Sequence, residues 1–487
     1  MLNALAVLSL LLAAIVPATA AAEPPPTFAD RTAALGLTLG TDAACWFDFD
    51  NDGWTDLCAS GVLWRNEKGA KFTRVGEFGL SVAADFDNDG YADLFSWSRR
   101  KLYRNEGGTG TFAEVPLPAD LPASVSRGAC WGDFDGDGFA DLYVGGYEDW
   151  EKNATYPSLL LLNQKGRGFK LAATDARYRA RGVTAADFDR DGDLDVYVSN
   201  YRLQPNLLLV NDGEGGLSDA ASLHNAVATS GAFRGGHSIG AAWGDFDNDG
   251  QIDLFAGNFA HRDSRGDQPQ SRFLRNPGPD GKYVFEDKGT CGVFYQESYA
   301  SPAAGDFDND GDLDLFFTTV YANASFGRKN YPVLFRNDGN WAFGDATAPA
   351  GLAQIGATYQ AAWADFDNDG DLDLVTGGRL YVNQPGTGVQ SRNRWLSVRL
   401  RGDGKRVNRS AVGAQVRIRR KDGRVLTRQV EAGTGEGNQN DLTLHFGLGG
   451  DDRSPALALE ILWPDGTTQT VTRVSPNRRL TVTYRRR

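Results

Sequence analysis

The stretch CWFDFDNDGWTDLC, residues 45–58, places four aspartates within nine residues of an otherwise apolar segment. Carboxylates this close repel one another, and a cation among them turns that repulsion into coordination. The order D-x-D-x-D-G-x-x-D matches the first nine positions of a calcium loop of the EF-hand type, with side-chain oxygens at positions 1, 3, 5 and 9. Gly53, at position 6, permits the sharp turn. The stretch therefore predicts a metal loop, and its all-oxygen ligand set favours Ca²⁺ over Mg²⁺.

A single copy would also fit an ordinary polar turn, but the pattern recurs throughout the chain. The seven copies contain Asp48, Asp50, Asp52 and Asp56; Asp85, Asp87, Asp89 and Asp93; Asp133, Asp135, Asp137 and Asp141; Asp187, Asp189, Asp191 and Asp195; Asp245, Asp247, Asp249 and Asp253; Asp306, Asp308, Asp310 and Asp314; and Asp365, Asp367, Asp369 and Asp373. We expect these aspartates to bind up to seven Ca²⁺ ions.

Each copy lies between two short β-prone segments, as in SIGAAWGDF (238–246) and IDLFAGNF (252–259). A second signature with turn residues follows, for example LWRNEKGAKF (63–72). These alternations predict four strands in each repeat. Four-stranded sheets bury their faces by stacking around an axis, which gives a β-propeller. The sequence therefore predicts an all-β fold, with a seven-bladed propeller over residues 27–385.

The seventh repeat lacks an outer strand of its own. A segment of the missing type occurs near the N-terminus, in TFADRTAALGL (27–37). We therefore expect the N-terminal segment to complete the last blade and close the ring.

The first residues predict export. An apolar run of 13 residues, ALAVLSLLLAAIV (4–16), precedes an A-x-A site at residues 18–20, and the run is shorter than the roughly 20 residues that span a membrane. We expect a signal peptide over residues 1–22, no transmembrane segment, and a secreted protein in an extracellular or periplasmic location. In such a compartment the four cysteines, Cys45, Cys58, Cys130 and Cys291, either pair or remain as buried thiols.

The negative charge lies in the repeats. Residues from 393 onward carry 19 Lys and Arg against 9 Asp and Glu, so the remainder carries 31 against 54 of the totals of 50 and 63. Seven Ca²⁺ ions would neutralise much of this excess, so the acidity needs no cationic partner. Export and the lack of a recognisable motif also exclude a nucleic-acid partner.

The repeats resemble the FG-GAP or VCBS-type repeats of integrin α-like propellers. Residues 393–487 are similar to the ASPIC/UnbV domain of the cartilage acidic protein family and its bacterial secreted relatives, through NRWLSVRLRG (393–402), VGAQV (412–416), LHFGLG (444–449) and LWPDG (462–466). The chain departs from that family at GEGNQND (435–441). Strand alternation predicts a small all-β domain here. The resemblance to integrins implies calcium loops on one face and ligand binding on the other.

Two of the four histidines flank the fifth copy symmetrically. His237 lies eight residues before Asp245, and His261 lies eight residues after Asp253. If the hairpin keeps its register, the imidazoles meet at the other end of the blade, where Glu297 of the next repeat can join them. Two histidines and a carboxylate can hold a transition metal. A packed or hydrogen-bonded pair of histidines is the alternative.

We interpret the chain as a calcium-binding propeller that acts as a binding or adhesion module for a protein or polysaccharide on its ligand face. Two alternatives remain, namely a metalloenzyme that uses His237 and His261, and a polysaccharide-binding module that uses aromatic side chains. Whether the protein is an enzyme is left open. No nucleophile motif or phosphate loop is evident in the sequence, so any activity would have to arise on the propeller face itself.

Overall fold

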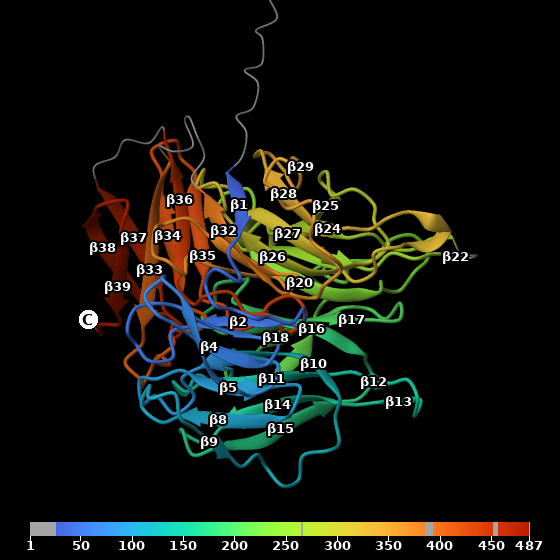
Figure 1. The fold of residues 1–487 in the computed structure, drawn as a ribbon. Helices are drawn as coiled ribbons and strands as arrows, with labels where there is room; N and C mark the ends of the chain where they lie inside the picture. The colour runs from blue at the N-terminus through green and yellow to red at the C-terminus, as the bar shows by residue number, and fades with distance from the viewer. Residues whose placement is uncertain (1–25, 264–265, 385–392, 451–455, 487) are drawn as a thin grey trace, which may run out of the picture.

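A computed structural model describes residues 26–263, 266–384, 393–450 and 456–486, and they form an all-β protein (Figure 1). The predicted signal peptide, residues 1–22, lies outside the described residues. Two one-turn 3₁₀ helices, η1 (Pro279–Gly281) and η2 (Ser325–Gly327), occur in the described part of the chain.

Seven four-stranded antiparallel sheets follow one another through residues 27–384 of the described chain, and we number them one to seven. They consist of β2 (Ala44–Phe47), β3 (Asp56–Ala59), β4 (Val62–Asn66) and β5 (Phe72–Glu77); β6 (Ser81–Ala84), β7 (Asp93–Ser96), β8 (Lys101–Asn105) and β9 (Phe112–Val115); β10 (Ser126–Gly132), β11 (Asp141–Gly146), β14 (Ser158–Asn163) and β15 (Phe169–Asp175); β16 (Ala180–Ala186), β17 (Asp195–Asn200), β18 (Leu207–Asn211) and β19 (Leu217–Asp219); β20 (Ser238–Gly244), β21 (Asp253–Asn258), β24 (Arg272–Arg275) and β25 (Glu286–Gly289); β26 (Tyr299–Gly305), β27 (Asp314–Thr319), β28 (Val333–Asn337) and β29 (Phe343–Asp345); and β30 (Ala362–Ala364), β31 (Asp373–Thr376), β32 (Arg379–Gln384) and β1 (Thr27–Asp30).

The N-terminal strand completes the seventh sheet. β1 pairs antiparallel with β32, and Phe28 lies opposite Asn383. Phe28 also packs against Trp363 of β30, with ring centroids 6.1 Å apart. The expected closure by residues 27–37 is therefore confirmed.

The first strand of each sheet, which precedes the aspartate loop, contacts the first strands of its two neighbours. These contacts run from β2 through β6, β10, β16, β20, β26 and β30 and return to β2. The strands are almost fully buried and rich in alanine and glycine, as in the SIGAAWG of β20. Small side chains let neighbouring backbones approach closely, so the sheets form a propeller-like ring.

Two short hairpins project from the ring at its end away from the aspartate loops. They are formed by β12 (Glu148–Asp149) with β13 (Ala154–Thr155), and by β22 (Arg262–Asp263) with β23 (Gly266–Asp267). In Figure 1 both hairpins lie on the right, opposite the C-terminal strands.

The C-terminal strands form two further sheets. One has the order β36-β33-β39, from β33 (Arg394–Arg401), β36 (Leu444–Gly449) and β39 (Arg479–Thr483), and β33 runs parallel to β39. The other has the order β35-β34-β37-β38, from β34 (Gln415–Arg419), β35 (Val425–Gln429), β37 (Leu457–Leu462) and β38 (Thr468–Val474). One apolar cluster joins Trp131 and Phe134 of the third repeat to Ile418 and Trp463. The C-terminal domain therefore packs directly on the ring.

The connection between β35 and β36 occupies the middle of the ring. This channel segment, residues 430–441, forms hydrogen bonds or an ion pair with the first strand of every sheet. The partners are Trp46, Ala83, Trp131, Arg181, Ala241, Ser301 and Trp363. The channel segment therefore fills the middle of the ring at the level of these contacts.

The four cysteines are free thiols in the structure. Cys45 and Cys58 lie directly opposite each other on β2 and β3. Three of the four are buried, while Cys291 is partly exposed. The sequence left both pairing and buried thiols open, and the structure has the second arrangement.

Candidate metal centres and the face opposite them

Each aspartate loop is a turn held by its own carboxylates. In the first loop, the backbone N–H of Gly53 donates to Asp48 Oδ2 at 3.2 Å, and that of Trp54 donates to Asp52 Oδ1 at 2.9 Å. Gly53 has a φ of 88°, a left-handed conformation that favours glycine. The glycine at position 6 is thus required by the turn.

The same turn occurs in all seven copies. The bond from the position-6 glycine to the position-1 aspartate measures 2.7–3.2 Å. The bond from position 7 to the position-5 aspartate measures 2.8–3.0 Å. The sequence pattern therefore specifies one local structure, repeated with little variation.

The loops leave buried oxygens without partners. Among the described residues, the second carboxylate oxygen of the position-1 aspartate is buried and unbonded in six loops, at Asp48, Asp133, Asp187, Asp245, Asp306 and Asp365. In the remaining loop, Asp85 Oδ1 accepts the N–H of Asp89 at 3.1 Å. A buried acceptor without a donor is costly unless something else satisfies it. Because these oxygens have no hydrogen-bond donor, they are free to coordinate a cation.

The carboxylates also converge. Ligand atoms of the aspartates at positions 1, 3 and 9 lie within 4.8 Å of one another, for example in Asp48, Asp50 and Asp56. The same holds for the triads that begin at Asp85, Asp133, Asp187 and Asp245. Repeated, half-buried, all-oxygen clusters fit Ca²⁺, whose flexible coordination accepts six to eight oxygens. The aspartates of each loop would hold the ion, which would stabilise the loop by neutralising them.

Burial and repulsion from neighbouring carboxylates raise the pKa of the position-1 aspartate in every loop. The pKa of Asp85 rises to about 7, and those of Asp133, Asp187 and Asp365 rise to about 8, with burial as the largest cause and the neighbouring carboxylates adding to it. Charged oxygens so close together need a counterion to remain ionised at neutral pH. A bound divalent cation would supply it.

A second set of residues, which the sequence analysis overlooked, joins the loops into a ring. At the end of the third strand of each sheet, an asparagine donates its backbone N–H to the position-9 aspartate at 2.6–2.9 Å. Its side-chain amide donates to the position-2 phenylalanine carbonyl of the preceding loop at 2.8–3.0 Å. The asparagines are Asn66, Asn105, Asn163, Asn211, Asn276, Asn337 and Asn383. Asn66 bonds to Phe366, so the network is closed.

The sequence contained a signal for this network. The asparagine recurs in the second signature of each repeat, where it reads as turn chemistry. Its distance from the next loop varies between 19 and 34 residues, and its side-chain partner lies in the preceding repeat. Local spacing therefore could not identify the bond.

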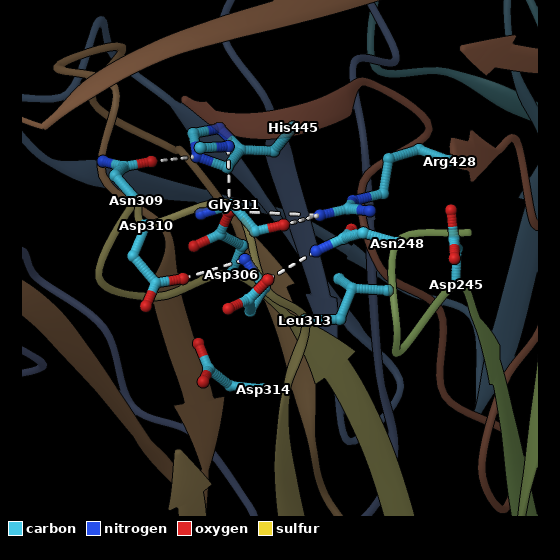
Figure 2. A network of polar contacts seen from close by, with 12 residues as sticks. Asp245, Asn248, Asp306, Asn309, Asp310, Gly311, Leu313, Asp314, Arg428 and His445 are labelled. Carbon is cyan, nitrogen blue, oxygen red and sulfur yellow. Dashed lines mark hydrogen bonds and ion pairs between the residues drawn. The ribbon is translucent and has the colours of Figure 1, made fainter. Parts of the chain in front are cut away.

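The C-terminal domain covers the loops unequally, with the fifth and sixth most directly engaged. The backbone N–H of Thr427 donates to Asp245 Oδ2 at 3.1 Å, and that of Gly447 donates to Asp306 Oδ2 at 2.9 Å. Arg428 lies between the two loops, with Nη2 at 3.9 Å from Asp306 Oδ2 (Figure 2). Both position-1 aspartates are at most 1% exposed. The C-terminal domain thus supplies hydrogen-bond donors to the carboxylates of two aspartate loops.

His445 adds a side-chain contact between the C-terminal domain and the sixth loop (Figure 2). Its Nε2 lies 2.6 Å from Asn309 Oδ1, while Asn309 Nδ2 donates to the Gly370 carbonyl at 3.0 Å and to Asp371 at 2.7 Å. Because the amide hydrogens are committed, Nε2 must carry the proton and donate it. Burial lowers the pKa of His445 to about 3, so the ring is neutral.

The structure brings the two predicted histidines together at the end of β20 away from the loop. The rings of His237 and His261 are perpendicular, with centroids 5.3 Å apart. Glu297 Oε1 lies 2.8 Å from His261 Nδ1 and also accepts from Ser325 Oγ at 2.8 Å. Burial opposes ionisation of Glu297, but these hydrogen bonds outweigh it and lower its pKa. Glu297 therefore orients His261.

The hydrogen bond of His237 works against the proposed metal geometry. His237 Nδ1 faces the backbone N–H of Arg202 at 3.3 Å. A ring nitrogen that accepts a hydrogen bond is unprotonated, so in the neutral ring the proton lies on Nε2 and blocks it as a metal ligand. This arrangement matches the hydrogen-bonded pair better than a two-histidine metal site.

Aromatic and charged side chains gather around these histidines on what we call the far face, at the sheet ends away from the aspartate loops. Arg181 lies over the rings of Tyr147, Tyr201 and Tyr359 at 5.1–5.4 Å and pairs with Glu436 of the channel segment. Tyr201 packs against His237 at 4.6 Å. Further aromatic side chains are exposed nearby, namely Trp150 at 72%, Tyr321 at 59% and Tyr331 at 40%. Such a surface suits contact with a partner.

Comparisons with known protein families agree with these features. An FG-GAP-like repeat model matches residues 85–144, 187–256 and 320–376, and the ASPIC and UnbV model matches residues 404–487. Cartilage acidic protein 1 of Xenopus tropicalis is 31% identical over 297 residues, which cover 59% of this chain and 42% of the relative. The Homo sapiens protein of that name is 29% identical over 295 residues, which cover 59% and 41%. The chain spans about two fifths of the length of these relatives.

Among solved structures, the chain matches an Agrocybe aegerita lectin that recognises non-reducing terminal N-acetylglucosamine. It has 17% identity and a TM-score of 0.40, with 74% of this chain and 92% of the lectin covered. YCF48 bound to D1 peptide has 10% identity and a TM-score of 0.44, with 75% of this chain and 99% of that chain covered.

Among the described residues, no helix has the length and apolar character to cross a membrane.

The chain thus carries FG-GAP-like repeats and a C-terminal ASPIC and UnbV domain, and it is homologous to cartilage acidic protein 1. The predicted family resemblance is confirmed.

Proposed function

We propose that this chain of FG-GAP-like repeats with its ASPIC and UnbV domain is a secreted, calcium-loaded, seven-bladed β-propeller that binds a partner on its far face. The blade count is supported by the seven four-stranded sheets of the described residues and by the closed cycle of contacts between their first strands. Secretion rests on the apolar run and A-x-A site of residues 4–20.

One observation carries the calcium assignment. The same buried carboxylate oxygen lacks a partner in six of the seven loops, and Asp189 Oδ1, Asp195 Oδ2 and Asp367 Oδ1 are likewise buried without a partner. A bound ion explains why the same oxygen lacks a hydrogen-bond donor in repeat after repeat.

Elemental analysis of the purified protein tests the assignment. We expect about seven calcium ions per chain, as the seven copies imply. Loss of about one ion in Asp133→Asn would assign the third site. Protein that is free of calcium at millimolar calcium concentration would refute the proposal. The same measurement tests the enzyme alternative, since stoichiometric zinc, copper or iron that disappears in His237→Ala would favour a metal site there.

The far face favours a glycan over an apolar protein partner. Aromatic rings such as Trp150 and Tyr321 can stack on the apolar faces of sugars, while the charged groups beside them suit hydroxyl groups. Arg202 lies 4.3 Å from the Trp150 ring and pairs with Glu148 at 2.8 Å, which holds this rim in place.

A glycan array tests this partner class directly. We expect wild-type protein to bind a set of polysaccharides and Trp150→Ala to bind them at least ten-fold more weakly. Leu223→Ala, which removes an exposed apolar side chain from the fourth repeat, serves as the matched control. Equal binding by Trp150→Ala and wild type would show that Trp150 is not part of the binding site. Binding to protein ligands alone would show that the partner is a protein and not a glycan.

A further inference from the structure

The channel segment fits the ring along its whole length. The N–H of Trp131 donates to the carbonyl of Ala432 at 2.9 Å, and at the other end of the segment the N–H of Gln439 donates to the carbonyl of Ala44 at 2.9 Å. Between them, the N–H of Gly435 bonds to a carbonyl of the fifth sheet. These are backbone contacts, as in the interior of a domain, so the segment is an integral part of the ring.

Glycines of the ring make room for this segment. A Cβ at Gly182 of β16 would lie 2.2 Å from the carbonyl oxygen of Gly435, and one at Gly240 of β20 would lie 2.8 Å from the carbonyl carbon of Gly435. On the segment itself, a Cβ at Gly437 would lie 2.5 Å from the Trp97 ring. Ring and segment are therefore complementary in shape, with no space for larger side chains.

A buried ion pair fixes the segment at the far face. Glu436 Oε1 accepts from Arg181 Nε at 2.9 Å and from Arg181 Nη2 at 2.6 Å, and both side chains are under 9% exposed. The N–H of Glu436 also donates to Ser301 Oγ at 3.1 Å. A buried pair of this kind sets register, because any other position leaves both charges without partners.

The two ends of the segment are attached at calcium loops. β35, which precedes it, donates through Thr427 to Asp245 in the fifth loop, and β36, which follows it, donates through Gly447 to Asp306 in the sixth. Backbone bonds from Val425 to the carbonyl of Asn248 and from Gly449 to that of Asn309 strengthen both contacts. In both aspartates, Oδ2 accepts from the domain while Oδ1 remains unbonded.

We propose that calcium in the fifth and sixth loops fastens the C-terminal domain to the ring and so holds the channel segment in place. This inference rests on the calcium sites of the proposed function and adds a role for two of them. An ion on Oδ1 fixes the orientation of each carboxylate, so that Oδ2 stays aligned with the domain's N–H groups. Without the ion, nothing holds Oδ1 in place, and the loops lose the geometry that receives β35 and β36. By linkage, the docked domain tightens calcium binding at these two loops to the same extent.

Hydrogen–deuterium exchange of the full chain, read by mass spectrometry at saturating calcium, tests the proposal. Asp306→Asn removes a ligand from a covered loop, and Asp133→Asn is its matched control, because no hydrogen bond joins the third loop to the C-terminal domain within the described residues. We expect Asp306→Asn to speed exchange across residues 430–449 by about ten-fold or more, and Asp133→Asn to leave that exchange at the wild-type rate.

Equal acceleration in the two variants would overturn the proposal, because it would indicate general loosening of the ring. An unchanged rate in both would overturn it as well. Because Asp306 also accepts the N–H of Gly447, graded chelation of calcium from wild-type protein separates loss of the ion from loss of that hydrogen bond, and it also serves if Asp306→Asn does not fold. Residues 430–449 should then lose protection in step with calcium loss, and protection that persists in calcium-free protein would refute the fastening while leaving the calcium sites intact. Failure to find calcium by elemental analysis would instead refute the proposed function itself.

Discussion

The third and sixth aspartate loops have the same local structure and different surroundings. Both bond the position-6 glycine to the position-1 aspartate, at 3.0 Å for Asp133 and 3.1 Å for Asp306. In the sixth loop the C-terminal domain adds a backbone donor to Asp306, and Asp308 is only 5% exposed. In the third loop Asp135 is partly exposed. The nine-residue pattern therefore determines the turn, whereas a segment more than a hundred residues away determines how the turn is covered.

Removal of calcium from all loops should lower the stability of the protein most, and it tests whether the third and sixth loops both depend on calcium. Each site with ligand at 100 times its Kd stabilises the fold by about 2.7 kcal/mol, so the summed loss should lower the Tm by well over 10 °C. Scanning calorimetry with calcium and with chelator measures it. An unchanged Tm would mean that neither covered nor open loops depend on calcium.

Single substitutions should separate the two loops. Asp133→Asn loses the contribution of one ion, about 3 kcal/mol, whereas Asp306→Asn also weakens the charged acceptor of Gly447 and should lose about 1 kcal/mol more. Chemical denaturation in calcium gives both values. Identical losses would show that the cover over the sixth loop adds no stability.

The channel segment offers a sharper test of the cover itself. Gly437→Ala places a Cβ 2.5 Å from the Trp97 ring at a φ of 68° and should destabilise the protein by about 3 kcal/mol. Gly423→Ala is the control, because its φ is 93° but nothing lies within 4 Å of the added Cβ, so it should lose only about 1–2 kcal/mol. Equal losses in urea denaturation would argue against tight packing in the channel.

The smallest effect concerns Glu431, which lines a cavity of about 110 Å³ between ring and domain. Burial raises the pKa of Glu431 to about 8. Because the folded state holds the proton more tightly than the unfolded state, this group's contribution to stability declines as pH rises from about 4.5 to 8. Glu431→Gln should therefore be neutral at pH 5 and stabilising by about 1–3 kcal/mol at pH 8. Melting at both pH values measures the difference, and a pH-independent effect would contradict it.

The sequence predicts what is local and repeated. The aspartate loops, the four strands of each repeat and the closure by β1 all follow from spacing, because strands and turns are specified by neighbouring residues. The meeting of His237 and His261 also follows from hairpin symmetry, although β20 contains a register shift between Ser238 and Ala241. Spacing also places Glu297 beside them, but the N–H of Arg202 that faces His237 Nδ1 could not be derived from spacing.

The channel segment was not predictable in the same way. GEGNQND (435–441) is polar and glycine-rich, which is typical of an exposed loop, yet Asn438 and Gln439 are fully buried. The partners of the whole segment lie in seven different strands, so no local pattern reveals them. The only trace in the sequence is a glycine within several first strands, such as Gly128, Gly182 and Gly240, where the segment passes.

The closed asparagine network bears on how such a ring can evolve. The side-chain amide of each asparagine needs the phenylalanine carbonyl of the preceding repeat, and Asn66 finds it in Phe366 at the other end of the ring. Duplication or deletion of one repeat would keep every bond between neighbours but alter the circumference into which the C-terminal domain fits. We therefore expect the fit of the channel segment to keep the repeat number constant, so that such a lineage diversifies through its surface loops.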